Sequence, residues 1–233
     1  MIVVASLTTI PSRIETSCRL AIDSLIHQVE HIYLSIPSYY KRFSKSITIP
    51  DYFSEEPYRS KVSIVICEDK GPATKYLGAL GRIPENTYIF FCDDDQEYHD
   101  NLISRMMQSV TPNAVYQNRY SIIQNQTSGG LIHGFVGNLV NSSLLKDLPN
   151  FILPDSAYHV DDQWISIYYF LNNIPIKGTG IEHYWEIYKV LENNHEKLGK
   201  DSLAALGTRN ARVAELARFF NVKFIEKGLI SEA

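Results

Sequence analysis

The sequence has few cysteines, no long hydrophobic run and no excess of positive charge, and each shortage argues against a class of protein. The three cysteines, Cys18, Cys67 and Cys92, are odd in number and scattered, so they do not suggest a disulfide framework. No apolar stretch approaches the roughly 20 residues needed to cross a bilayer. The net charge is −4, and no basic stripe could follow a phosphate backbone. We expect no membrane span and no nucleic-acid partner.

Signals for export and the common nucleotide-binding motifs are also missing. The first seven residues lack a basic segment and lead quickly to Pro11 and Arg13, which predicts a first strand rather than a signal peptide. A cytoplasmic location is therefore the simplest expectation. Neither G-x-G-x-x-G after the first strand nor G-x-x-x-x-G-K-[ST] occurs, which argues against a dinucleotide oxidoreductase and a P-loop NTPase.

What the chain does contain is an alternation of strand and helix patterns. We predict strands at 2–7, 31–36, 62–67 and 88–92, and helices at about 14–25, 73–80, 98–110, 161–171 and 203–220. This rhythm predicts an α/β fold with a mostly parallel central sheet flanked by helices. Glycines near residues 129–137 suggest an added small mixed sheet, and 233 residues suit one sizeable domain.

The acidic triplet Asp93-Asp94-Asp95 follows directly after the apolar run 88–92. If the strand continues through it, Asp93 and Asp95 point to the same side. Adjacent carboxylates raise one another's pKa unless a cation or hydrogen bonds compensate, and such oxygen ligands favour Mg²⁺ or Mn²⁺. Ligands of open α/β sheets bind at the carboxyl ends of strands. The triplet equally fits a solvated turn that caps a helix.

Three segments together resemble the GT-A class of nucleotide-sugar glycosyltransferases: Thr8-Thr9-Ile10-Pro11-Ser12-Arg13, the stretch 68–75 with its Gly-Pro-Ala-Thr-Lys sequence, and the acidic triplet. The resemblance is strongest over 1–110, and it looks particularly like the small glycosyltransferase domains that chlorella viruses encode for capsid glycans. It implies a GT-A-like, Rossmann-type three-layer fold in one domain over 1–233. Residues 1–110 would bind the nucleotide and 111–233 the acceptor.

The resemblance also implies a metal site. Asp95 would be the main carboxylate on Mn²⁺ or Mg²⁺, and Asp93 would contact the ion or the ribose. Asp94 would face the sugar or stay structural. Some relatives also supply a late histidine to the metal, and His183 and His195 are the candidates here; we favour His195 because its surroundings look more like a loop.

Further residues would bind the donor nucleotide. The resemblance places Thr8, Pro11 and Arg13 along the nucleotide, Asp69 near the base and Lys75 near the diphosphate or ribose. Arg13 and Lys75 could equally be surface cations, and Thr8 could serve only its turn.

A second acidic pair, Asp161-Asp162, opens a strongly apolar predicted helix. Carboxylates at a helix N-terminus can simply satisfy free backbone N–H groups. The resemblance instead implies that the pair faces the acceptor and that one member is the general base, which must be ionised and within hydrogen-bond reach of the nucleophile. We favour Asp162, followed by Asp161. The loop 133–138 before the pair contains Gly134 and Phe135, and its aromatic ring could stack on a sugar.

We therefore expect a metal-dependent glycosyltransferase of the hexosyltransferase type, which moves a sugar from a UDP-sugar to a hydroxyl of a glycan or glycoprotein acceptor. One alternative is a sugar-phosphate nucleotidyltransferase, although such enzymes usually carry a glycine-rich loop after the first strand and 8–13 contains no glycine. The other is a non-catalytic carbohydrate-binding module. The donor sugar, the anomeric outcome and the oligomeric state are left open.

Overall fold

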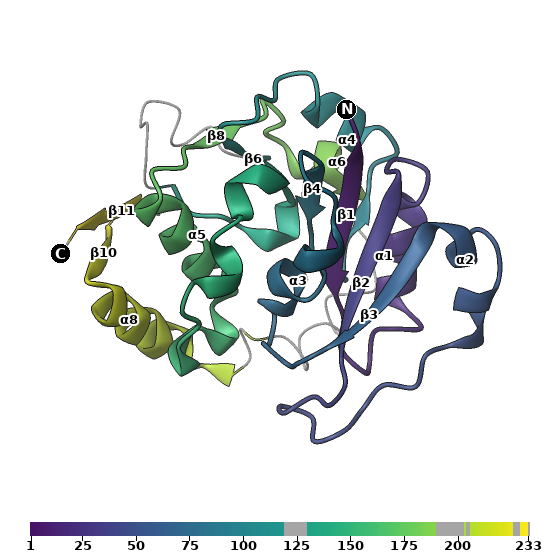
Figure 1. Ribbon diagram of the computed structural model, residues 1–233, viewed down its shortest axis with the longest axis horizontal. Helices are drawn as coiled ribbons and strands as arrows, with labels where there is room; N and C mark the ends of the chain where they lie inside the picture. Colours follow the sequence, from purple (N-terminus) through teal and green to yellow (C-terminus); the bar gives the residue numbers. More distant parts are fainter. Residues whose placement is uncertain (119–129, 190–202, 204–205, 226–228, 233) are drawn as a thin grey trace.

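A central sheet flanked by helices is seen in the computed structural model of the protein (Figure 1). The sheet has seven strands. The structure describes residues 1–118, 130–189, 203, 206–225 and 229–232. The strand order is β3-β2-β1-β4-β7-β6-β8. Four neighbouring strands are parallel, namely β3 (Val62–Cys67), β2 (His31–Pro37), β1 (Val3–Thr8) and β4 (Tyr88–Phe91). β7 (Asn138–Asn141) runs antiparallel to both β4 and β6 (Val115–Gln117), and β8 (Ile176–Gly178) is parallel to β6.

Helices cover both faces of this sheet because its inner strands are apolar on both sides. In β1, Val3, Ala5 and Leu7 belong to one hydrophobic cluster and Val4 to another, as the period of two requires. The first cluster includes α1 (Ser17–Leu25) and α4 (Leu102–Met106), and the second includes α3 (Thr74–Leu77) and α5 (Asp161–Leu171). The expected three-layer α/β arrangement is confirmed.

Smaller elements surround these layers. β5 (Glu97–Tyr98) and β9 (Tyr188–Lys189) form an antiparallel ribbon, directly after α6 (Tyr184–Ile187). The short helix α2 (Tyr58–Lys61) precedes β3. Near the C-terminus, α8 (Arg209–Phe220) leads to the hairpin of β10 (Val222–Ile225) and β11 (Leu229–Glu232), at the left of Figure 1. None of the helices in the described ranges is long and apolar enough to cross a membrane.

Several predicted boundaries were wrong. The predicted helix 98–110 is shortened to α4 because Glu97 and Tyr98 pair with β9, a long-range contact that the local pattern does not show. The predicted helix 73–80 is only one turn, α3, and a separate 3₁₀ turn (Leu80–Arg82) follows it. α8 begins at Arg209 rather than at 203. β4 ends at Phe91, so the acidic triplet is a turn and does not extend the strand.

The topology places a crevice beside this turn. From β1 the chain proceeds outward to β2 and β3, and then returns to the other side of β1 as β4. Connections on the two sides of such a switch point diverge, and ligands of open α/β sheets bind in the gap at the carboxyl ends. The loops after β1 and β4, which carry Arg13 and the acidic triplet, border this gap.

Candidate active site

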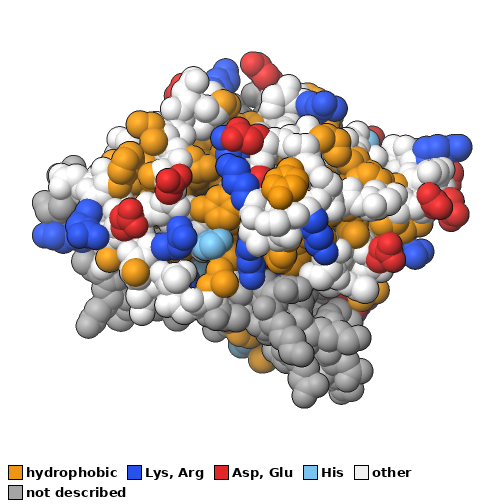
Figure 2. Space-filling model, turned by 90° about the horizontal axis from the view of Figure 1, so that it is seen from below, with side chains coloured by type: hydrophobic (Ala, Val, Ile, Leu, Met, Phe, Trp, Pro, Cys, Tyr) orange, Lys and Arg blue, Asp and Glu red, His pale blue; other side chains and the backbone are white. Residues whose placement is uncertain are grey.

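A cavity of about 620 Å³ lies at the carboxyl edge of the sheet. One wall comes from the loops after β1, β2, β3 and β4, and the opposite wall from residues 133–136, the 3₁₀ turn Asp155–His159 and the start of α5. The cavity is large enough for a ligand of several rings. On this face of the molecule, seen from below in Figure 2, Lys and Arg side chains gather near the centre with hydrophobic side chains between them.

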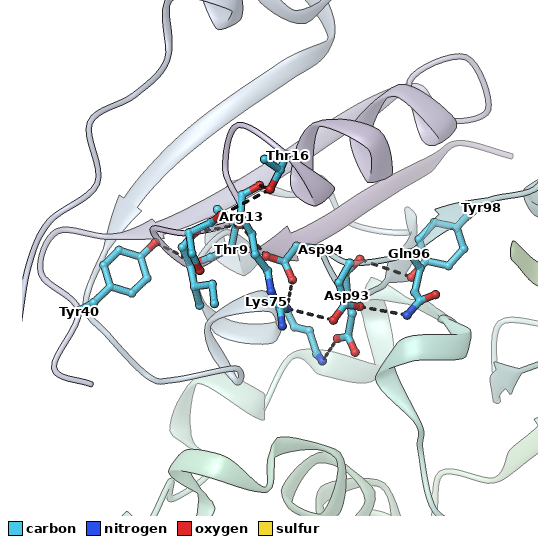
Figure 3. Close-up of polar contacts among 12 residues, drawn as sticks. Thr9, Arg13, Thr16, Tyr40, Lys75, Asp93, Asp94, Gln96 and Tyr98 are labelled. Atoms are coloured by element: carbon cyan, nitrogen blue, oxygen red, sulfur yellow. Dashed lines mark hydrogen bonds and ion pairs between the residues drawn. The ribbon is translucent and has the colours of Figure 1, made fainter. Parts of the chain in front are cut away.

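The acidic turn distributes its three carboxylates between two cations (Figure 3). Asp93 accepts from the Lys75 Nζ at 2.7 Å, and Asp94 accepts from Arg13 Nη1 at 2.8 Å. Arg13 also lies 3.0 Å from the Asp95 Oδ2. Thr9 donates its hydroxyl to Asp94 at 2.6 Å. The carboxylates therefore meet in one corner of the cavity through a turn, and not through a continuation of β4.

The three carboxylates of this corner outnumber the two cations that contact them. Burial, followed by repulsion from Asp93 and Asp94, raises the pKa of Asp95 to about 7, although Arg13 opposes the shift. A divalent cation fits these carboxylates, because they offer hard oxygen ligands and an excess of negative charge. In the part of the chain that the structure describes, no three His, Cys, Asp or Glu side chains surround one point. Asp93 and Asp95 would therefore supply only part of a coordination shell; His195 lies outside the described residues.

Lys75 connects the acidic turn to the second acidic pair. Its ammonium lies 2.7 Å from Asp93, 2.8 Å from Asp161 and 4.0 Å from Asp162. The residue is 3% exposed, and although burial disfavours its charge, Asp161 and Asp93 hold its pKa well above the usual value. Its backbone carbonyl accepts from the buried Ser6 hydroxyl of β1. Lys75 is thus an internal cation and not the surface residue that the sequence left possible.

Gly134 packs directly over this cluster. A Cβ at this position would lie 2.5 Å from Lys75 Nζ, 2.9 Å from Asp93 Oδ1 and 3.1 Å from Asp162 Oδ1. The Gly134 N–H donates to Asp162 at 3.0 Å. A side chain here would displace the Lys75 ammonium or the Asp93 carboxylate, and the Gly134 N–H holds the Asp162 carboxylate at the cavity wall.

Asp161 and Asp162 differ in environment although they are adjacent. Asp161 is 6% exposed and paired with Lys75. The Asp162 side chain is 23% exposed and lines the cavity. Burial, followed by the charge of Asp161, raises the pKa of Asp162 to about 8. Asp162 can therefore exchange a proton near neutral pH.

The expected nucleotide residues lie partly along this cavity. Thr8, Arg13, Asp69 and Lys75 line it, whereas Pro11 is not among its lining residues. Thr8 donates its hydroxyl to the carbonyl of Ser35 in β2 at 2.7 Å, so this hydroxyl joins two neighbouring strands rather than the turn that follows β1.

Asp69 ties three loops together. Its Oδ2 accepts from the Lys41 N–H at 2.7 Å and from the Tyr158 hydroxyl, while its Oδ1 accepts from the Gly71 N–H at 2.8 Å. Gly71 has φ +60°, and a Cβ on it would lie 2.3 Å from the Tyr158 carbonyl oxygen. The loop after β3 can therefore pack tightly against the opposite wall, and most of the acceptor capacity of Asp69 is used internally.

Other lining residues were missed by sequence reasoning. Thr9 and Tyr40 join the loops after β1 and β2, since the Tyr40 hydroxyl donates to the Thr9 carbonyl at 2.9 Å. Arg42, His159 and Arg209 reach the cavity from three separate elements. Thr9 could have been found from its place in the Thr-Thr pair before Pro11, but nothing local marks Arg209, because the C-terminal helix is brought to the cavity only by the fold.

Comparisons with known proteins give structural likeness without sequence likeness. No family model matches the chain, and no curated protein matches it. Among solved structures, it is similar to 2-C-methyl-D-erythritol 4-phosphate cytidylyltransferase of Francisella tularensis, with 12% identity, coverage of 89% of this chain and 98% of that one, and a TM-score of 0.46. The galactosyltransferase LgtC, in complex with donor and acceptor sugar analogues, has 11% identity, coverage of 76% and 73%, and a TM-score of 0.44. The glycosyltransferase GlyE of Streptococcus pneumoniae has 17% identity and a TM-score of 0.46; the match covers 99% of this chain and 54% of that one.

Proposed function

We propose that this protein is a metal-dependent glycosyltransferase that moves a sugar from a UDP-sugar to a hydroxyl of a glycan acceptor. The observation that carries the proposal is the joining of two acidic groups by one buried cation. Lys75 contacts both Asp93 of the strand-end turn and Asp161 of α5, and all three line a cavity at the switch point of the sheet. The carboxylates of the acidic turn suit the binding of a divalent cation with a diphosphate. The pair Asp161-Asp162 suits the binding of an attacking hydroxyl.

The donor half of the reaction needs positive charge at the diphosphate. Asp93 and Asp95 would hold Mn²⁺ or Mg²⁺, which supplies charge stabilisation for the departing phosphate oxygens. Arg13 and Lys75 lie in the same corner and add two fixed cations, which need no reorganisation as negative charge develops. Both cations already contact carboxylates, so their side chains are oriented before a ligand arrives.

The acceptor half of the reaction requires a proton acceptor, and Asp162 is placed for it. In the inverting form, the acceptor oxygen bonds to the anomeric carbon, the bond from that carbon to the diphosphate oxygen breaks with its electron pair on UDP, and the hydroxyl proton passes to the ionised Asp162. In a retaining form, no such base is required, and the carboxylate stabilises positive charge at the anomeric carbon. The residues of the site suit either form.

The test is nucleotide binding and donor turnover. Isothermal titration with UDP, with and without MnCl₂, should show manganese-dependent binding in the natural protein, and incubation with UDP-sugars should release UDP. Asp95→Ala should lose the manganese dependence while the fold stays intact, because the change removes a metal ligand and relieves carboxylate repulsion. Asp100→Ala is the matched control, since Asp100 follows the same turn but its side chain is 85% exposed.

Two results would overturn this assignment. Unchanged manganese-dependent UDP affinity in the Asp95 variant would remove the acidic turn from the site. Release of pyrophosphate from UTP in the presence of sugar phosphates, without UDP release from UDP-sugars, would make the protein a nucleotidyltransferase.

A further inference from the structure

Two aromatic side chains line the cavity that Asp162 also lines, and a third aromatic residue follows one of them along the chain. Phe135 and Tyr184 both line the cavity, and their ring centroids are 6.1 Å apart. Trp185 follows in α6, is not a lining residue, and is 66% exposed; Tyr184 is 39% exposed. We call Phe135, Tyr184 and Trp185 the aromatic shelf. Exposed large rings beside a polar cavity are a common mark of a binding surface.

The helix α6, which carries Tyr184 and Trp185, is tied to the chain beside the acidic turn. The ribbon of β5 and β9 pairs Tyr98 with Tyr188, so α6 is tied to the chain three residues after Asp95. Arg105 of α4 contacts Glu186 of α6 at 2.7 Å, which fixes the same helix from a second side. Rings fixed in this way lose little conformational entropy when a ligand packs on them.

The Trp185 indole is itself oriented by a neighbour. Its ring stacks on His183 with centroids 4.2 Å apart and an interplanar angle of 6°. His183 caps the N-terminus of α6, together with Glu186. One indole face is therefore covered by His183, while most of the side chain remains in solvent.

We propose that the aromatic shelf binds a saccharide acceptor of at least two pyranose rings. The terminal ring would lie against Phe135 and Tyr184 inside the cavity, within the volume that Asp162 also lines, and the next ring would pack on the outer face of Trp185. The apolar C–H face of a pyranose matches an aromatic face, whereas its hydroxyl edge stays in water. The role of this saccharide as acceptor rests on the proposed glycosyltransferase function, but its binding does not.

The two tryptophans allow a direct test. Trp164 is fully buried and Trp185 is exposed, and the chain has no third, so iodide quenching of fluorescence reports on Trp185. The probes are cellotriose, maltotriose, mannotriose, galactotriose and N-acetylchitotriose with their monosaccharides, titrated with UDP and MnCl₂ present. At least one trisaccharide should protect Trp185 from iodide and bind about tenfold more tightly than its monosaccharide, the equivalent of about 1.4 kcal/mol.

Calorimetry on variants then separates the shelf from the rest of the site. Trp185→Ala should remove the advantage of the trisaccharide and leave UDP affinity unchanged, and Trp185→Phe should restore part of the advantage. Phe219→Ala is the control, because Phe219 is 53% exposed on α8 and is not among the lining residues. An equal loss for monosaccharide and trisaccharide in Trp185→Ala, or no protection of Trp185 by any probe, overturns the shelf.

The two proposals fail in different ways. Saccharide binding on Trp185 without UDP binding would leave the shelf standing and would identify a carbohydrate-binding module. UDP binding and donor turnover without protection of Trp185 would leave the glycosyltransferase standing and remove the shelf.

Discussion

Lys75→Met should lower the free energy of unfolding far more than the loss of an exposed lysine would, because Lys75 is buried between carboxylates. Lys75 is 3% exposed, and its ammonium contacts Asp93 and Asp161 at 2.7 and 2.8 Å. Methionine keeps a similar volume, so the change removes charge with little change in packing. Removing one partner of a buried ion pair leaves an uncompensated charge, which typically costs about 3–5 kcal/mol. We expect a loss of this size in the free energy of unfolding at pH 7.

Lys70→Met is the matched control. Lys70 makes an ion pair of the same length, 2.7 Å, with Glu68, but the two side chains are 37% and 66% exposed. Exposed pairs are screened by water and contribute little. The two variants therefore compare burial at constant geometry, and Lys70→Met should stay close to the natural protein.

The pH dependence gives a second check. Without the ammonium, neighbouring buried carboxylates face one another with no cation between them, and protonation relieves their repulsion, so the folded variant binds more protons than the unfolded chain. Its stability then rises as the pH falls, and the loss in Lys75→Met should be smaller at pH 5 than at pH 7. Urea unfolding followed by circular dichroism measures both differences. A loss as large in Lys70→Met, or a Lys75→Met loss that is identical at the two pH values, would refute the reasoning.

Two further predictions concern the loop over the cluster and the proposed base. Gly134→Ala should lower the free energy of unfolding by about 1–3 kcal/mol, since its Cβ would meet Lys75 and Asp93 within 3 Å; Gly81→Ala, which has nothing within 4 Å, should leave the thermal midpoint nearly unchanged, and equal midpoints for both variants would contradict this. The rate of sugar transfer, if inverting, should rise with pH through an apparent pKa near 8, that of Asp162, and Asp162→Asn should lower it about 10²–10⁴-fold. A pH profile that Asp162→Asn leaves unaltered would exclude that residue as the base. The same raised pKa works against folding as the pH rises from about 4 through 8, because the folded protein holds a proton that the unfolded chain releases.

Sequence reasoning worked best where burial alone selects a residue type. The four parallel strands were predicted within one residue at each end, because a strand buried on both faces is apolar along its whole length. It was weaker where contact with a distant segment of the chain decides the local structure. Nothing local indicates that 97–98 pairs with 188–189, and this pairing shortened the predicted helix after the acidic triplet.

The candidate site divides along the same line. Asp93, Asp94 and Asp95 were expected at the carboxyl edge of the sheet because they follow a buried strand. Only the family resemblance implied that Asp161 and Asp162 face the bound substrates. All five residues line one cavity. The strand does not continue through the triplet, because the chain turns at Asp94, so strand alternation is not what brings Asp93 and Asp95 to the same cavity. The roles of these residues in metal binding and catalysis stay predictions.

The sequence by itself determined the α/β class and the composition of the acidic corner, because the pattern of apolar residues sets which segments must be buried, and strand ends then fall at a common edge. The tertiary structure alone decided which charges face one another. Lys75 lies buried between the acidic turn and Asp161, and Tyr184 and Arg209 line the same cavity. The sequence does not show these contacts, because they join segments far apart in the chain and depend on how the layers pack.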